Sequence, residues 1–184
     1  MSRPDWEERY RKPGCVCGTE PAGFLVEHFN ELPVGAALDL AMGDGRNALF
    51  LARHGFAVTG IEKSPTAIVK ARARASGLGV ALTTVEADLE NYTLLVEVFE
   101  VVLCFNYLQR SLFAAMARAL KPGGALVMET YTMDELKLPH GPRHPEHLLQ
   151  PGELYRAFRH LRVAYYREVT QANRAVASLL AFRP

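Results

Sequence analysis

The sequence predicts an α/β fold: a doubly wound, mostly parallel sheet of seven strands with an antiparallel hairpin at its C-terminal end. Two observations carry this expectation. Short apolar runs alternate with helical patterns between residues 36 and 132, and strands separated by helices pair in parallel with helices on both faces. Two further runs, Arg162–Val169 and Ala175–Arg183, alternate around the turn Gln171-Ala-Asn173, which is typical of a hairpin.

Local start and stop signals place the elements in order. Ser2 as a cap and Pro4 in the first turn favour a helix through Arg11, and a second helix with one apolar face is expected over Thr19–Leu32. Strands are predicted at residues 36–41, 57–62, 81–88, 98–105 and 125–132. Helices are predicted at residues 46–54, 64–77, 111–120 and 153–160, the last after an irregular segment that contains three prolines.

Composition limits the class of protein. The chain has 184 residues, 49% of them hydrophobic, which suits one domain over residues 1–184 with the N-terminal helices, residues 1–32, as a lid. The 21 Lys and Arg nearly balance the 20 Asp and Glu, so no strong field would recruit nucleic acid or an acidic membrane. No apolar run approaches the ~20 residues of a membrane span, and the charged N-terminus does not read as a signal peptide. We expect a cytoplasmic protein, monomeric or homodimeric.

Cysteines and histidines do not form a metal-site pattern. Cys15 and Cys17 lack the second ligand pair that a structural zinc site needs, and Cys104 stands alone in an apolar run, so we interpret all three as reduced thiols. His140, His144 and His147 gather in a proline-rich loop without regular spacing. We interpret this loop as part of a pocket lid and expect no metal.

The most informative segment runs from Ala37 to Lys63. An apolar strand leads through Asp39 into a turn with Gly43 and Gly45, and after a helix a second strand ends at Glu62. Glycines let the backbone approach a ligand closely, and a carboxylate at a strand end can accept hydrogen bonds from both ribose hydroxyls. This pattern predicts a site for a ribose-containing cofactor and leaves its identity open between a dinucleotide and a sulfonium.

Three signals in order resemble the class I S-adenosylmethionine-dependent methyltransferases, which have a Rossmann-like fold. They are the segment just described, Asp88-Leu89 at the end of the third strand, and the turn Pro122-Gly123-Gly124 before the fifth. The resemblance implies S-adenosylmethionine as the cofactor. It implies a site in which Asp39 orients the amino group, Glu62 holds the ribose and Asp88 with Leu89 contacts the adenine. The complete set of cofactor-binding residues that we predict is Tyr10, Asp39, Ala41, Gly43, Gly45, Arg46, Asn47, Glu62, Lys63, Asp88, Leu89 and Phe105.

Within that class the chain resembles the tellurite-resistance methyltransferase group. It shares the opening Trp6-Glu-Glu-Arg9-Tyr10 and the run Gly45-Arg46-Asn47. It departs from the group at Ala41-Met42, where glycine and cysteine are usual, and a Cβ at position 41 is expected to deny the backbone a positive φ. The histidine-arginine pair associated with chalcogen methylation is also not evident, since residues 167–170 read Arg-Glu-Val-Thr.

The acceptor is expected over the carboxyl ends of the strands, where open α/β sheets bind ligands. We predict Asn106, Tyr131 and Arg143 as catalytic residues. Pocket candidates are Tyr10, Asn106, Tyr107, Arg110, Tyr131 and Arg143. Glu129 reads either as a base or as a buried carboxylate satisfied by backbone groups.

The predicted function is in-line methyl transfer to a small soluble acceptor such as a thiol or a chalcogen oxyanion. A nicotinamide-dependent oxidoreductase is the alternative that the ribose-binding segment also suits, although the Pro122-Gly123-Gly124 turn and the hairpin count against it. A non-catalytic protein that binds S-adenosylmethionine stays open because of Ala41-Met42.

Overall fold

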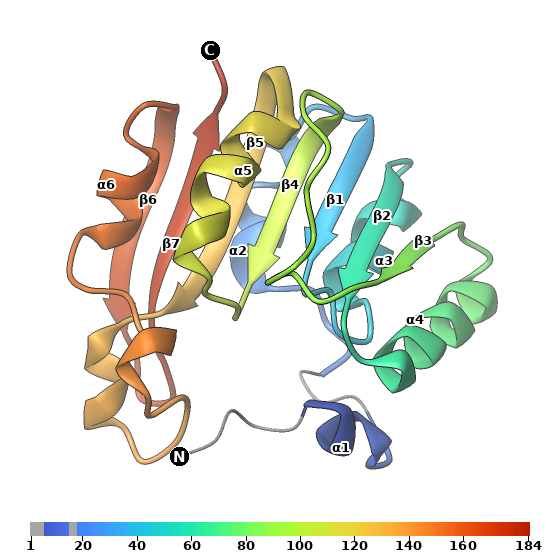
Figure 1. Cartoon of the computed structure of the whole chain (residues 1–184), viewed down its shortest axis with the longest axis horizontal. Helices are drawn as coiled ribbons and strands as arrows, with labels where there is room; N and C mark the ends of the chain where they lie inside the picture. Colours follow the sequence, from blue (N-terminus) through green and yellow to red (C-terminus); the bar gives the residue numbers. More distant parts are fainter. Residues whose placement is uncertain (1–5, 15–17) are drawn as a thin grey trace.

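The computed structural model describes residues 6–14 and 18–184, so Ser2, Pro4, Cys15 and Cys17 lie outside the described residues. One seven-stranded sheet has the order β3-β2-β1-β4-β5-β7-β6 (Figure 1). Its first five strands pair in parallel, and β7 pairs antiparallel with both β5 and β6. The strands are β1 (Ala36–Leu40), β2 (Ala57–Glu62), β3 (Thr83–Glu86), β4 (Phe99–Phe105), β5 (Leu120–Tyr131), β6 (Arg162–Thr170) and β7 (Ala175–Phe182). The predicted fold class is confirmed.

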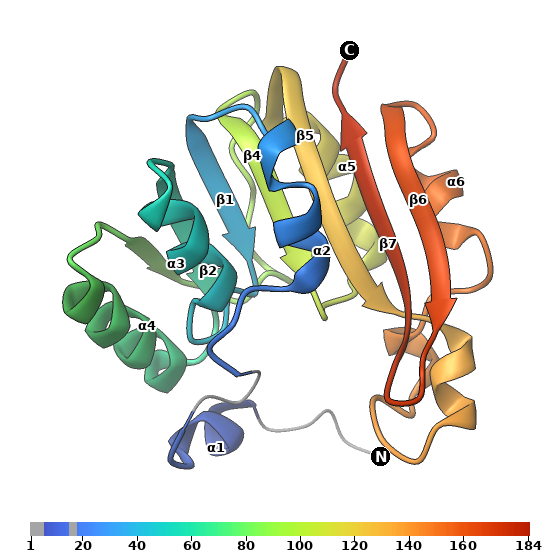
Figure 2. The same cartoon turned by 180° about the vertical axis from the view of Figure 1, so that it is seen from behind.

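Helices cover both faces of this sheet. The α-helices are α1 (Trp6–Arg11), α2 (Gly23–Glu27), α3 (Arg46–Arg53), α4 (Pro65–Leu78), α5 (Phe113–Ala119) and α6 (Glu153–Phe158). Short 3-10 helices occupy Phe29–Glu31, Arg110–Leu112, Met133–Lys137 and Pro145–His147. Figure 1 shows α5 and α6 on one face, and Figure 2 shows α2, α3 and α4 on the other. Helix α1 lies below the strand tips, beside the start of α4 (Figure 1).

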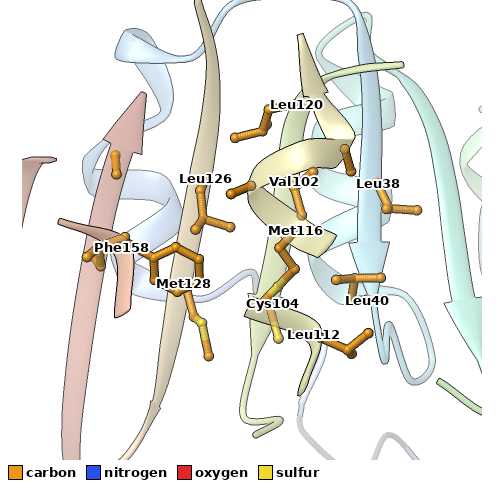
Figure 3. Close-up of a cluster of buried hydrophobic side chains, with 14 of the residues drawn as sticks. Leu38, Leu40, Val102, Cys104, Leu112, Met116, Leu120, Leu126, Met128 and Phe158 are labelled. Carbon is orange, nitrogen blue, oxygen red and sulfur yellow. The ribbon is translucent and has the colours of Figure 1, made fainter. Parts of the chain in front are cut away.

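The alternation of side chains along the strands builds two apolar clusters. Leu38, Val102 and Met128 point to the face of α5 and α6, where they meet Met116 and Phe158 (Figure 3). The intervening strand residues point to the opposite face and pack against Phe24, Leu25 and Leu51 from α2 and α3. Because both faces are buried, the strands read as continuous apolar runs, which fixes their register.

The connection from β3 to β4, residues 87–98, contains no helix. Successive parallel strands are usually joined through a helix, but β3 and β4 are not, although helices cover both faces of the sheet. The uncovered side of β1, β2 and β3 keeps an apolar hollow of about 420 Å³ lined by residues such as Leu38, Ile61, Val85 and Leu94. Leu94 is buried at this hollow, so the irregular segment 87–98 covers part of this face of the sheet.

Helix α2 also differs from its prediction. The expected helix over residues 19–32 is regular only from Gly23 to Glu27, and a 3-10 turn over Phe29–Glu31 follows it. Phe24, Leu25 and Leu32 are nevertheless buried as the periodicity indicates. The apolar periodicity therefore predicts the buried face correctly. Pro21 and Gly23 both disfavour helix, so the regular helix is shorter than the predicted one.

Candidate functional site

The loop after β1 turns through three residues with positive φ, which carry the chain from the strand to α3. These are Ala41 (φ 52°), Gly43 (φ 59°) and Gly45 (φ 85°), and Gly45 caps the start of α3. The expectation that the methyl of Ala41 denies this conformation is wrong, because the alanine adopts it. A left-handed alanine costs on the order of 1 kcal/mol, so the loop is held in this shape by its surroundings.

Met42, the other departure from the tellurite-resistance pattern, is a core residue. Its side chain is buried with Ile68 and Ala71 of α4. It lies against Gly60 of β2, where any Cβ would collide with the thioether. The unusual methionine therefore fills the space under α4 and leaves the loop backbone, with Ala41, to face a ligand.

Asp39, two residues before the loop, is a buried carboxylate with one oxygen free. It is 2% exposed, and Oδ2 has no hydrogen-bond partner among the described residues. Burial raises its pKa from 3.8 to about 7, although the backbone N–H of Ala48 and the charge of Arg46 lower it and Glu62 raises it further. An unpartnered buried acceptor is costly unless a ligand satisfies it, and a cationic amino group would do so.

Glu62 organises the loop. Its Oε2 accepts from the N–H of Gly43 at 2.9 Å, and Oε1 accepts from the N–H groups of Lys63 and Ser64, each at 2.9 Å. The carboxylate therefore ties the tip of β2 to the loop after β1. A carboxylate oxygen has more than one acceptor lone pair, so these bonds do not exhaust Glu62.

The third strand contributes a polar pair and an apolar residue beside Glu62. The N–H of Ala87 donates to the carbonyl of Glu62 at 3.0 Å, which brings the end of β3 to the end of β2. Lys63 Nζ donates to Asp88 Oδ2 at 2.5 Å, and Leu89 is buried in the adjoining core. The predicted base-contacting residues thus lie next to the predicted ribose carboxylate.

Helix α1 lies over the glycine loop. Its one buried residue is Tyr10, and a Cβ at Gly43 would collide with the Tyr10 hydroxyl. Together with the φ of 59° at Gly43, this close approach favours glycine at position 43 independently of any ligand. Tyr10, predicted as a cofactor-binding residue, therefore lies at the loop.

Phe105 and Asn106 complete the edge at the end of β4. Phe105 is buried, and Asn106 adopts a positive φ of 57° with its N–H donating to the carbonyl of Glu129 at 2.8 Å. Asparagine tolerates this conformation better than most residues. A second asparagine, Asn47, is engaged elsewhere, because its Oδ1 accepts from the N–H of Ala22 at 2.8 Å and so anchors the start of α2.

Arg110 is held by the protein rather than presented to a pocket. It forms a bidentate pair with Glu153, with contacts of 2.6 and 3.0 Å, and it donates to the carbonyls of Glu146 and Leu148, each at 2.9 Å. These contacts join the start of α5 to the segment before α6. Arg110, predicted as a pocket residue, is therefore engaged by other parts of the protein.

Arg143, predicted as catalytic, has the same kind of role. Its guanidinium donates to the backbone carbonyls of Glu135, Leu136, Leu138 and His140. It therefore closes the proline-rich loop on itself. These four contacts stabilise the loop, and the catalytic role of Arg143 stays a prediction.

Glu129 is buried and satisfied by side chains, not by backbone groups as one of its two interpretations had it. Its Oε1 pairs with Arg174, and its Oε2 accepts from Ser178 Oγ at 2.7 Å. Arg174 lies at the start of β7 and is absent from the predicted site. Tyr131, predicted as catalytic, is two residues further along β5, and its carbonyl accepts from Leu149 at 2.9 Å.

The remaining reactive groups are inert or dispersed. Burial raises the pKa of Cys104 to about 12, with Asp39 adding to the shift, so its thiol stays protonated. Among residues 6–14 and 18–184 no group of three or more His, Cys, Asp or Glu could hold a metal ion. In the same residues no helix has the length and apolar character that a bilayer crossing needs.

Sequence comparison matches this arrangement to a known family. A model described as "Methyltransferase domain" matches residues 37–124, which run from β1 into β5 and include the glycine loop, Glu62 and Asp88. Over these residues the chain is similar to the class I methyltransferases. S-adenosylmethionine is the cofactor of this class, and the orphaned oxygen of Asp39, the glycine loop and Glu62 fit it.

Known methyltransferases are similar in sequence and in fold. "Uncharacterized methyltransferase YodH" of Bacillus subtilis is 31% identical over 122 residues, 61% of this chain and 52% of that protein. TehB from Haemophilus influenzae has a TM-score of 0.76 at 18% identity, over 97% of this chain and 66% of that chain. An S-adenosylmethionine dependent methyltransferase from Mesorhizobium loti has a TM-score of 0.71 at 20% identity, over 88% and 98% of the two chains. The chain spans about half the length of the curated relative YodH.

Two residues at the candidate site were absent from the prediction. Asp44 lies inside the glycine loop, is 2% exposed and has an unpartnered Oδ2 among the described residues. Glu7 of α1 accepts hydrogen bonds from Ser64 and Thr66 at the start of α4. Asp44 could have been found from its place between two glycines, whereas nothing in the sequence joins Glu7 to residues more than fifty positions away.

Proposed function

We propose that the protein transfers the methyl group of S-adenosylmethionine to a small soluble acceptor, such as a thiol or a chalcogen oxyanion. The observation that supports this most directly is the conjunction of Asp39 with Glu62 on either side of the glycine loop. One carboxylate has a free buried oxygen, and the other holds the loop and keeps acceptor capacity.

Different residues would contact different parts of the cofactor. Asp39 would accept from the amino group, Glu62 from the ribose hydroxyls, and Asp88 with Leu89 would contact the adenine. Phe105 and Asn106 would line the sulfonium region, and Tyr10 would cover the loop. When bound, the cofactor supplies an electrophilic methyl group. The protein's contribution is then to position the two reactants and exclude water, and positioning alone can supply much of such a rate enhancement.

The acceptor would lie beside Asn106 and Tyr131. Glu129 is not proposed as a free base, because its carboxylate is already engaged by Arg174 and Ser178. Arg143 and Arg110 are not proposed as anion ligands, because their donors are committed to carbonyls and to Glu153. An acceptor that is nucleophilic on its own, such as a thiolate or an oxyanion, suits a site of this kind.

Calorimetric titration tests the donor assignment. S-adenosylmethionine and S-adenosylhomocysteine are expected to bind with micromolar affinity and NAD is not; tight NAD binding without the other two would instead support the oxidoreductase. Glu62→Gln is the informative variant, since an amide cannot accept from Gly43 and from Lys63 and Ser64 together. Glu86→Gln is the matched control, because Glu86 pairs with Glu62 in register yet is exposed.

The acceptor needs a separate screen. Methylation of thiols, chalcogen oxyanions, halides and small carboxylates is measured with labelled cofactor. Turnover with one of these classes supports the enzyme. Tight cofactor binding without turnover on any member would favour the non-catalytic, cofactor-binding alternative.

A further inference from the structure

Helix α4 presents a polar stripe that holds the N-terminal segment. Thr66, Lys70 and Arg74 are spaced by four residues and so share one face of the helix. Lys70 Nζ donates to the carbonyls of Lys12 and Gly14 at 2.7 and 2.9 Å. Arg74 donates to the carbonyl of Thr19 at 3.2 Å. Both long side chains therefore reach backbone that follows α1.

Glu7 makes the matching contact from the side of α1. It accepts from the hydroxyls of Ser64 and Thr66, each at 2.5 Å, and from the N–H of Thr66 at 3.3 Å. A carboxylate is favourable in the first turn of a helix, where backbone N–H groups lack partners. The hydroxyl bonds of Ser64 and then Thr66 hold the pKa of Glu7 near 2, so it is ionised at any physiological pH.

The same groups touch the predicted cofactor site. Ser64, which bonds Glu7, also donates its N–H to Glu62. Arg74, which bonds Thr19, also donates to the carbonyl of Asp44 in the glycine loop at 2.9 Å. The anchors of the N-terminal segment are thus shared with both sides of the loop on which Tyr10 rests.

Helix α1 contributes little to the hydrophobic core. Tyr10 is its one buried residue, and Trp6 is 42% exposed. Its position therefore depends on polar contacts with α4, and exposed polar contacts individually contribute little stability. Such an element can open while the sheet and its packed helices stay folded.

We propose that Glu7, Lys70 and Arg74 form a clasp that holds α1 closed over the glycine loop, and that opening of this clasp controls exchange of the bound cofactor. The exchange half of this inference rests on the proposed function. The clasp itself does not, because its contacts are all made between residues of this chain. Glu7, Lys70 and Arg74 are positioning residues that act through Tyr10, Glu62 and Asp44.

Limited proteolysis tests the clasp without any ligand. Trypsin is expected to cleave after Arg9 and Arg11 about fivefold faster in Glu7→Ala and in Lys70→Ala than in the wild type, as the loss of a few polar contacts allows. Arg72→Ala is the matched control, since Arg72 lies on α4 and donates to Thr84 on β3 instead. Cleavage of both clasp variants at the wild-type and Arg72→Ala rate would overturn the clasp.

Stopped-flow release of S-adenosylhomocysteine tests the exchange half. Dissociation is expected to be about fivefold faster in Glu7→Ala and Lys70→Ala, with the rate in Arg72→Ala unchanged. Equal rates in all four proteins, with proteolysis accelerated, would refute control of exchange. A wild type that binds no S-adenosylhomocysteine would instead refute the proposed function, and proteolysis would still decide the clasp.

Discussion

Ala41 stores strain at the start of the glycine loop. Its φ of 52° costs an alanine on the order of 1 kcal/mol, which a glycine avoids at the expense of greater freedom in the unfolded chain. We therefore expect Ala41→Gly to leave the free energy of unfolding unchanged or to raise it by up to about 1 kcal/mol. Urea denaturation measures this change.

The control for Ala41→Gly is the same substitution in a right-handed helix. Ala73→Gly, at an exposed position inside α4, should lower the free energy of unfolding by about 1 kcal/mol. If Ala41→Gly lowered it equally, the loop would not be strained at this residue. The comparison cancels the effect of glycine on the unfolded state.

Asp39 makes stability depend on pH. Its pKa is about 7 in the folded protein against 3.8 when unperturbed, so between these values the folded state retains a proton that the unfolded state has lost. The free energy of unfolding therefore contains a contribution from this proton, which is fully present below pH 3.8. It falls by about 1.4 kcal/mol per pH unit as the pH rises, and it is lost once the pH has passed 7. Asp39→Asn should gain stability relative to the wild type across that window. Urea denaturation at several pH values tests this, and a difference independent of pH would contradict it.

At the scale of elements, the strands were predictable and some connections were not. Residues such as Leu38, Val102 and Leu126 lie in uninterrupted apolar runs, and burial on both faces makes such runs visible in a sequence. The segment 87–98 covers part of the sheet without a helix, through buried residues such as Leu89 and Leu94, and no apolar periodicity predicts this. The length of α2 was overestimated for a related reason: periodicity reports burial, not hydrogen bonding.

Arg110 joins two elements, and its loss should be felt in stability. Arg110→Ala removes the bidentate pair with Glu153 and two bonds to carbonyls, leaving Glu153 partly buried without its partner. Because Arg110 is partly exposed, we expect a loss of about 1–2 kcal/mol in the free energy of unfolding. Urea denaturation of Lys137→Ala supplies the comparison: its pair with Asp134 is exposed and should contribute less than about 0.5 kcal/mol. Equal losses would mean that Arg110 is an ordinary surface charge.

For the whole molecule, the sheet order explains why half of the site could be predicted. Asp39 and Glu62 lie near the carboxyl ends of β1 and β2, and Asp88 follows β3. The carboxyl ends of neighbouring parallel strands meet at one edge of the sheet, so a sequence pattern suffices to place these residues together. Glu129 with Arg174, and Glu7 with Ser64, come from elements joined only by the tertiary fold. Neither pair has a local spacing from which a contact could be inferred. The sequence therefore predicts which of the proposed cofactor-binding residues lie together, but it does not predict the contacts around the proposed acceptor site.

Binding of the cofactor should stabilise the whole fold, because its predicted contacts lie on β1, β2, β4 and α1 together. A ligand at about 100 times its dissociation constant adds about 2.7 kcal/mol, which in a domain of this size raises the melting temperature by roughly 5–10 °C. Differential scanning calorimetry should show this rise with S-adenosylmethionine and S-adenosylhomocysteine and no rise with NAD. Glu86→Gln should keep the rise and Glu62→Gln should lose most of it. A rise with NAD alone would indicate that the ribose-binding segment binds a dinucleotide. An equal rise in both variants would show that Glu62 does not bind the cofactor.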